Sequence, residues 1–497
     1  FDFGEFGHWG GFAAVTEAES WNRGRRGVSC RRGSLADIDL VRGRSWARIA
    51  DGAGMVESRS NRGESGPRRS FLSAFGPGLL FAGAAIGVSH LVQSTRAGAA
   101  FGIGMVGVVL LANLVKFPAF RFGPHFSAAT GRPLLDGYRR QGTWVLVAFS
   151  LLTLATMFTV TAVVTIVTAG VAIALFGLDG TLEATVGAAN GPATVSAAIM
   201  LLLAGLLAIG GYAWLDRFMK IVMPVLTLAT LVAAAIAIPR IDWSQASVLP
   251  QGVFVDAASI AFTVALIGWM PTAVDISVWS SLWTLARGRQ RGERLETRGV
   301  LLDFDVGYVA TTVLAIAFVL LGTGLMHGRG IDFEDNAARF ANQVIDLYAS
   351  TLGAWSRPLI GTAAFLAMLS TVAAVIDAFP RVIAAIVAQF RMLRRDTPKD
   401  LPHDGDRGVY RIGFAVLCAG SLGILFFAMS GFKALVDLAT TLSFLTAPAL
   451  AFFNHRAIFG PLMPEAARPR RAMWIASVLS ITAQASFAAW FLWGRFG

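Results

Sequence analysis

A succession of apolar blocks, each about as long as a membrane-spanning helix, constrains this chain more than any other feature. From Phe71 onward there are eleven such blocks, at 71–98, 101–118, 143–176, 192–211, 214–238, 256–285, 300–326, 355–389, 409–429, 433–458 and 472–493. About twenty apolar residues in a helix cross the hydrocarbon core of a bilayer. The sequence therefore predicts an all-α membrane protein with eleven transmembrane helices.

Composition agrees with a lipid environment. Hydrophobic residues make up 55% of the chain and charged residues only 15%, whereas soluble domains carry about 25% charged residues. The net charge of +11 could suggest a nucleic-acid partner, but none is expected. The Lys and Arg residues fall between apolar blocks and do not form one basic surface. With only Cys30 and Cys418, neither a disulfide framework nor a thiolate metal site is expected.

The first seventy residues differ from the rest. Residues 1–70 are rich in Arg, Gly and Ser, show no sustained periodicity and lack the apolar core of a signal peptide. We expect a disordered basic N-terminal tail here, followed by one transmembrane domain at 71–497.

The connections between the blocks predict orientation. Arginines gather before the first block and in the even-numbered connections, such as "ARGRQRGERLETRG" after the sixth block, and the odd-numbered connections hold few cations. Cytoplasmic loops of membrane proteins are enriched in Lys and Arg. The N-terminus is therefore expected in the cytoplasm and the C-terminus outside, in a bacterial inner membrane.

Two blocks carry polar interruptions. The first block contains "GAAIGVSHLVQST" and the sixth contains "LIGWMPTAVDIS". Pro271 lacks a backbone N–H and disfavours helical geometry at Met270, so the sixth helix should break there. Blocks one and six are the first helices of two sets of five, and paired broken helices indicate the binding site of an inverted-repeat transporter. We expect the interruptions at Gly87–Ser89 and Gly268–Pro271 to face one another.

At these residues the chain resembles the Nramp family of divalent metal transporters. "FGPGLLFAGAAIGVSHLVQSTRAGAAFG" resembles the family's first helix, "MPTAVDISVW" its sixth and "TTLSFLTAPALAFF" its tenth, over roughly 71–460. The resemblance implies the LeuT-type fold, with two inverted five-helix repeats at about 71–238 and 256–458 and an extra helix at 472–493. It also implies proton-driven transport of divalent ions of the manganese, iron or magnesium class.

The departures from the family concern its metal ligands. Where the family has Asp-Pro-Gly-Asn, this chain has Gly-Val-Ser-His, so the metal-binding Asp falls on Gly87 and the Asn on His90. The family's Met is kept as Met270 and its His falls on Thr272. His90, Met270 and Asp275 would form a mixed nitrogen, sulfur and oxygen set that suits a transition metal. His90 alternatively carries a proton or is a hydrogen-bonded core residue.

An Asp inside a membrane span is costly and by default functional, with a structural partnership as the alternative. Asp275, Trp279 and Trp283 share one helix face, because they are spaced by four residues. A carboxylate beside aromatic rings is typical of organic-cation sites. A plain alternative for Trp283 is that it anchors the helix at the interface.

Three other charged residues allow more than one interpretation. Asp377 and Arg381 flank Pro380 at a spacing of four residues, either as an internal gate or as a simple helix pair. Lys116 is expected to snorkel to the inner surface from the end of its helix.

The sequence thus predicts a secondary transporter of divalent metal cations, with the metal as cargo, a proton as candidate coupling ion and no resident cofactor. The predicted binding residues are Gly87, Ser89, His90, Gly268, Met270, Thr272 and Asp275. One alternative is a transporter of a small organic cation or amino-acid-like solute, and another is a non-transporting receptor on the same scaffold. No enzyme is expected, because the chain has no metalloprotease or nucleotide-binding loop motif.

Overall fold

The computed structural model describes residues 76–187, 190–244, 249–330, 353–393, 406–427 and 432–496, with single positions at 247 and between 339 and 349. The predicted tail at 1–70 lies outside the described residues. Within the described ranges every regular element is a helix, as predicted for an all-α protein.

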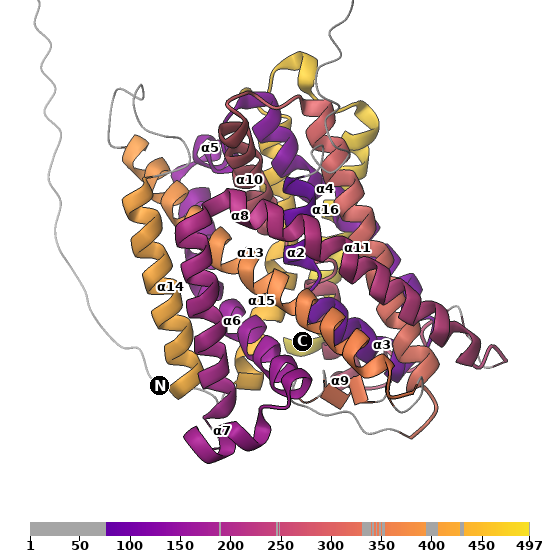
Figure 1. Ribbon diagram of the computed structural model, residues 1–497. Helices are drawn as coiled ribbons and strands as arrows, with labels where there is room; N and C mark the ends of the chain where they lie inside the picture. The colour runs from indigo at the N-terminus through magenta and orange to yellow at the C-terminus, as the bar shows by residue number, and fades with distance from the viewer. Residues whose placement is uncertain are drawn as a thin grey trace, which may run out of the picture. The chain divides into compact units, whose positions relative to one another are not determined.

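The helices follow one another along the chain as shown in Figure 1. They are α2 (Pro77–Ala85), the π-helix η1 (Ser89–Ser94), α3 (Thr95–Phe101), α4 (Met105–Thr130), α5 (Leu134–Gln141), α6 (Thr143–Phe176), α7 (Asp179–Val186), α8 (Gly191–Ala237), the short 3₁₀ turn η2 (Ile238–Arg240), α9 (Ala257–Gly268), α10 (Ile276–Arg291), α11 (Thr297–Leu325), α13 (Ser356–Leu393), α14 (Arg407–Phe427), α15 (Phe432–Ile458), the 3₁₀ turn η4 (Glu465–Ala467) and α16 (Arg471–Phe496).

Each predicted apolar block coincides with one of these helices, with a broken pair or with half of α8. Helix α6 begins and ends with the predicted block 143–176. Helix α8 contains the fourth and fifth blocks. Gly211 separates them, because it leaves helical geometry with φ 51° and ψ −148°. Glycine adopts a positive φ without steric cost, so the chain turns between the two spans as expected.

Helix α4 differs from its predicted length. The second block was expected to end at 118, but α4 continues to Thr130 through Pro118 and Pro124. Tertiary packing explains the extension, since a Cβ atom at Gly123 would lie 1.9 Å from the Ser277 carbonyl oxygen. The α4 backbone is therefore held against α10 in the region where its two proline residues would otherwise favour the end of the helix. The short helices α5 and α7 were not predicted.

The structure breaks both helices in which the sequence predicts an interruption. Helix α2 ends at Ala85, Ile86 has φ −82° and ψ 80°, and the chain resumes through η1 and α3 at an angle of 51°. Helix α9 ends at Gly268 and α10 begins at Ile276, so residues 269–275 form no regular helix. Unwound backbone at this depth is tolerated where it lies inside the protein or lines a cavity.

The first broken helix lies in the middle of the bundle. Helix α2 contacts α8, α10, α11 and α13, and α3 packs along α11, as Figure 1 shows. Glycines bring these backbones together: a Cβ atom at Gly98 would lie 2.0 Å from the Val319 carbonyl oxygen, and one at Gly322 2.0 Å from the Thr95 carbonyl oxygen. Small residues allow such close packing of membrane helices.

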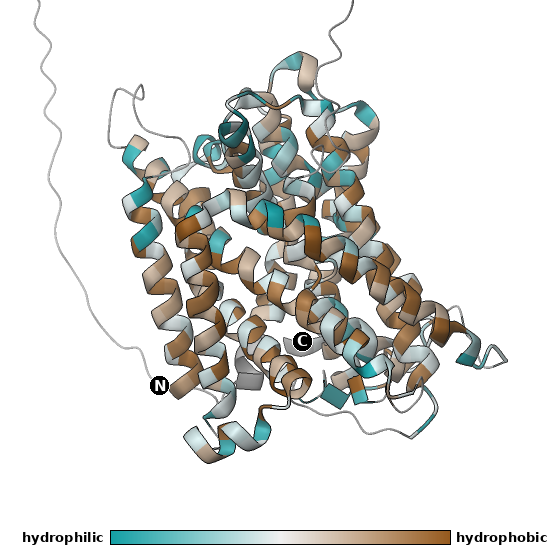
Figure 2. Cartoon of the chain, in the orientation of Figure 1, coloured by the Kyte–Doolittle hydropathy of each residue, from teal (hydrophilic) through white to brown (hydrophobic). Residues whose placement is uncertain are grey.

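The outer surfaces are apolar, as a lipid environment requires. Among the described residues, seven helices are long and apolar enough to cross a membrane, or eight with the broken pair α2–α3. Figure 2 shows hydrophobic residues along the middle of these helices and hydrophilic residues near α5 and α7. Leu114 and Ile209 expose 75% and 90% of their surface, which water would disfavour and lipid accepts. The chain is an integral membrane protein.

Candidate functional site

The two breaks face one another across a small cavity. The cavity has a volume of about 50 Å³, and its walls come from both broken helices and from α6, α13 and α15. The breaks are joined by a hydrogen bond from the Ser89 hydroxyl to the Pro271 carbonyl oxygen at 3.4 Å. The expected juxtaposition of the two interruptions is therefore present.

Thr371 of α13 stabilises the first break. Its hydroxyl lies 3.0 Å from both the Gly83 and the Ile86 carbonyl oxygens, which are helix-end acceptors without a complete set of partners. Gly87 allows this contact, because a Cβ atom there would lie 2.7 Å from the Thr371 Oγ1 atom. Gly87 and Thr371 both line the cavity.

Asp275 brings a carboxyl group to the second break. It stands at the first turn of α10 and is 9% exposed, at the end of the helix where the dipole favours negative charge. Its Oδ1 atom is buried and has no hydrogen-bond partner among the described residues. Buried polar atoms are nearly always paired, and Asp275 is a residue of the cavity wall, so this oxygen is a candidate contact for a ligand.

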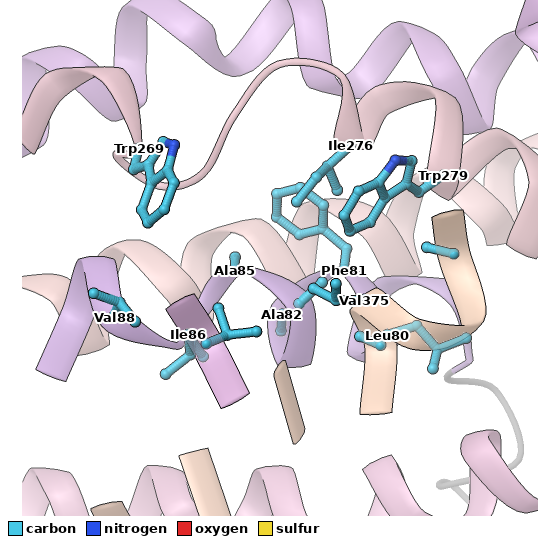
Figure 3. Packing of buried hydrophobic residues seen from close by; sticks show 14 of the residues in the cluster. Leu80, Phe81, Ala82, Ala85, Ile86, Val88, Trp269, Ile276, Trp279 and Val375 are labelled. Atoms are coloured by element: carbon cyan, nitrogen blue, oxygen red, sulfur yellow. The ribbon is translucent and has the colours of Figure 1, made fainter. Parts of the chain in front are cut away.

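Two tryptophans flank the second break and also line the cavity. Figure 3 shows Trp269 and Trp279 extending from this segment toward α2, where Ala85 lies between them on the facing helix. Trp269 donates from Nε1 to the Ser443 hydroxyl at 3.1 Å, and the Trp279 ring packs edge-on against Phe379 at 4.8 Å. The cavity therefore combines one carboxyl group with aromatic walls.

Lys116 does not reach the inner surface, so the expectation of snorkelling was wrong. It is 2% exposed, and its ammonium donates to the Ile267 and Gly268 carbonyl oxygens at 2.6 and 2.8 Å. It also lies 3.5 Å from the Thr272 carbonyl oxygen. These carbonyls belong to the end of α9 and the break, which attract a cation more strongly than the distant surface does.

Two of the predicted metal ligands lie away from the cavity. The His90 Nε2 atom is 3.0 Å from the Thr311 carbonyl oxygen of α11 and its Nδ1 atom is 2.9 Å from the Ser89 hydroxyl. Met270 packs in an apolar cluster with residues that include Met105 and Val319. Within the described residues no three His, Cys, Asp or Glu side chains form a metal-binding group. The set His90, Met270 and Asp275 is not assembled in this structure.

Of the predicted binding residues, Gly87, Ser89, Thr272 and Asp275 line the cavity together. Gly268 does not: a Cβ atom there would lie 2.6 Å from the Thr440 carbonyl oxygen, so this glycine permits close packing of α9 on α15. The sequence interpretation missed Thr371 and Trp269. The adjacent hydroxyl residues Ser370 and Thr371, which follow the apolar stretch Ala363–Leu369 of α13, are a signal that would have found the first.

Asp377, which is buried, and Arg381, which is half-buried, form an ion pair on α13. Arg381 donates from Nε and Nη2 to the two Asp377 oxygens at 2.7 and 2.8 Å. Trp283 Nε1 and the Tyr410 hydroxyl donate to the same carboxylate at 3.0 and 3.1 Å. Trp283 is fully buried, so its interpretation as an interface anchor was wrong. The pair joins α10, α13 and α14.

The beginning of α2 is held by a second polar group. The Asp303 carboxylate accepts from the backbone N–H groups of Gly76 and Gly78 at 3.2 and 2.9 Å. Nearby, Arg287 donates to Asp216 at 2.6 Å. This N-terminal half of the first broken helix is thus fixed by a carboxylate on α11.

Sequence comparison identifies one relative of comparable length, and no family model matches the chain. An uncharacterized protein of Pasteurella multocida (strain Pm70) is 32% identical over 393 residues, covering 78% of this chain and 84% of the relative. The chain belongs to the same family as this Pasteurella protein.

Solved structures share the fold. A mutant of the Eremococcus coleocola manganese transporter superposes with a TM-score of 0.59 at 13% identity, covering 88% of this chain and 91% of that one. MhsT in complex with L-phenylalanine gives a TM-score of 0.51 at 15% identity, with 84% and 98% covered. At these identities the likeness establishes the fold alone. It confirms the predicted LeuT-type fold of two inverted five-helix repeats and an additional helix.

Proposed function

We propose that this protein is a secondary transporter of a small cation, which binds in the cavity between the two breaks with Asp275 as its charged contact. The observation that carries the proposal is the buried Asp275 Oδ1 atom, which has no protein partner among the described residues and belongs to a residue of the cavity wall. Broken helices that face one another in an inverted-repeat fold are the usual binding place of such transporters.

The charge of the site favours a monovalent organic cation. Asp275 supplies one negative charge and Lys116, bound to the same break, supplies one positive charge, so the pair has no net charge before the solute enters. A divalent ion loses a large hydration energy and normally needs several charged oxygens. An organic cation needs only one carboxylate, and the faces of Trp269 and Trp279 add cation–π attraction.

The volume of the site favours a small solute. The cavity of about 50 Å³ is large enough for a few water-sized groups, since one water needs roughly 10–15 Å³ measured in this way. A solute of guanidinium or methylammonium size matches it better than a large amino acid.

A divalent metal, the substrate class predicted from the sequence, is the second candidate. Ser89, Thr272, Thr371 and Asp275 all present oxygen atoms around the cavity, and hard ions such as Mn²⁺ and Mg²⁺ prefer oxygen ligands. The related fold of a manganese transporter is consistent with this candidate. With His90 and Met270 turned away, a softer transition metal is a poorer fit.

Flux measurements with purified protein in liposomes test the proposal. Guanidinium is the best probe, because it stays protonated at neutral pH and does not leak as a neutral base. We expect saturable guanidinium uptake that methylammonium inhibits and Mn²⁺ does not. Saturable Mn²⁺ uptake that neither guanidinium nor methylammonium inhibits would establish the metal candidate instead. Binding without flux of either cation would indicate a receptor, and the proposed function would then be wrong.

A further inference from the structure

The end of α9 holds a buried lysine whose partners are all backbone carbonyls among the contacts described. Lys116 reaches across from α4, is 2% exposed, and contacts the carbonyl oxygens of Ile267, Gly268 and Thr272 at 2.6, 2.8 and 3.5 Å. An ammonium group has three N–H donors and no acceptor. The number of donors therefore matches the number of carbonyls.

These carbonyls form an arrangement that attracts cations. The last carbonyls of a helix have no partners within the helix and carry its negative dipole end. Where a transmembrane helix is discontinuous, such half-helix ends and unwound carbonyls are the places that coordinate coupling cations in secondary transporters. In this chain α9 ends at Gly268 and the unwound segment follows it directly.

We propose that Lys116 is a built-in cation: its ammonium fills a carbonyl site at the α9 terminus that otherwise takes a monovalent metal ion, so the protein works without Na⁺. Lys116 lies behind the cavity wall, because Thr272 lines the cavity and Lys116 does not. It therefore positions the break that carries Asp275 and offsets the charge of that carboxylate. The inference rests on the proposed function only for its transport consequences.

Removing the ammonium takes the donor away from the Gly268 and Thr272 carbonyls in a buried place, whereas the Ile267 carbonyl still accepts from the Met270 N–H. The loss is costly unless another group replaces the ammonium. Lys116→Ala also leaves the space that the side chain occupied. Na⁺ can enter that space and use the same oxygens, because hard cations prefer oxygen ligands. A purely structural lysine would give a destabilised variant without any response to Na⁺.

Thermal unfolding of the purified protein tests the carbonyl site without any transported solute. We compare wild type, Lys116→Ala and Lys220→Ala in NaCl and in N-methylglucamine chloride at equal ionic strength. Lys220 is the control, because it is a half-buried lysine whose partner is the Asp216 carboxylate. Na⁺ should raise the melting temperature of Lys116→Ala by roughly 2 °C or more and leave the other two proteins unchanged.

The flux assay adds the second measurement. Wild type should take up guanidinium equally in both salts, whereas Lys116→Ala should lose about tenfold in N-methylglucamine and regain most of it in Na⁺. If the alanine variant does not fold, Lys116→Ser is used in its place, because it leaves a similar space. A wild type that needs Na⁺, or a variant no more responsive to Na⁺ than Lys220→Ala, overturns the inference. A thermal response to Na⁺ without any flux would keep the inference and reject the proposed transport function.

Discussion

Two buried carboxylates, that of Asp275 at the second break and that of Asp377 in the ion pair on α13, have opposite surroundings. Asp275 lies at the break, and its Oδ1 atom has no hydrogen-bond partner among the described residues. Asp377 receives four donated hydrogen bonds from Arg381, Trp283 and Tyr410. A carboxylate that the protein satisfies has little to offer a solute, whereas an unpartnered one gains most from a cation. Burial alone therefore does not separate Asp275 from Asp377, whereas their hydrogen-bond partners do.

Asp136 on α5, outside the membrane-spanning segments, belongs with Asp377. Its carboxylate accepts from Arg132 at 2.9 Å and from Arg139. Burial alone would raise the pKa of Asp136, but the hydrogen bonds and charges of the two arginines outweigh it and lower the pKa. The Asp377 carboxylate connects three helices, and the Asp136 carboxylate fixes α5 to the turn before it, so we expect both to serve stability.

The largest expected effect is on transport by Asp275→Asn. The change keeps the size of the side chain and removes its charge, so guanidinium uptake should fall by about 100-fold, the scale of losing a buried charge partner. The melting temperature should stay close to that of wild type, because the amide keeps the size of the carboxyl group and one acceptor oxygen. Normal uptake by this variant would make Asp275 structural and the solute neutral or bound elsewhere.

Asp377→Asn should give the reverse pattern. The half-buried Arg381 would lose its countercharge, at a cost of about 3 kcal/mol in the free energy of unfolding. Guanidinium binding by the folded fraction should remain within about threefold of wild type, since Asp377 does not line the cavity and its carboxylate is already satisfied by protein donors. Thermal unfolding and equilibrium binding measure the two quantities. Unchanged binding with slower flux would favour the gate interpretation. Lost binding would show that Asp377, like Asp275, is needed for binding, and would contradict the distinction between the two residues.

A smaller effect is expected for Trp279→Leu. The substitution keeps an apolar wall and removes the aromatic face, which contributes about 1–2 kcal/mol to a desolvated organic cation, or roughly tenfold in affinity. Mn²⁺ gains little from a ring, so its binding, if present, should not change. Competition binding with both cations measures the difference, and equal losses for the two would remove the argument for an organic solute.

The smallest effect is expected for His90→Gln. The imidazole is fully buried and both ring nitrogens have neutral partners in Ser89 and Thr311. We therefore expect transport within about twofold of wild type and an unchanged pH profile. A flattened pH profile would instead support the hypothesis, drawn from the sequence, that His90 carries a proton.

The spans and the two breaks could be predicted because they depend on local quantities. Hydrophobic length determines which segments enter a membrane, and Pro271 removes a hydrogen bond wherever its helix lies. These properties need no knowledge of neighbouring helices. The same is true of the pairing of blocks one and six, which follows from their order in the chain.

Side-chain direction could not be predicted in the same way. Lys116 was expected at the inner surface because it stands at the end of its predicted helix. Its contact with the α9 carbonyls depends on how α4 crosses the second break, which the sequence does not show. His90 turns toward α11 because η1 is a π-helix, which changes the face that each residue presents. Met270 lies in an unwound segment, where no periodicity relates neighbouring residues. Only the packing of several helices decides which polar groups meet.

Cysteine modification at Thr272 tests the central claim most directly. With Cys30 and Cys418 replaced, Thr272→Cys places a thiol of similar size on the cavity wall. Detergent-purified protein is treated with a methanethiosulfonate reagent that carries an ethylammonium group or with one that carries an ethylsulfonate group. The account predicts that the cationic reagent reacts at least about tenfold faster, that guanidinium slows it, and that Asp275→Asn abolishes the preference. Equal rates for both reagents, with no protection by guanidinium, would contradict a cation site between the two breaks.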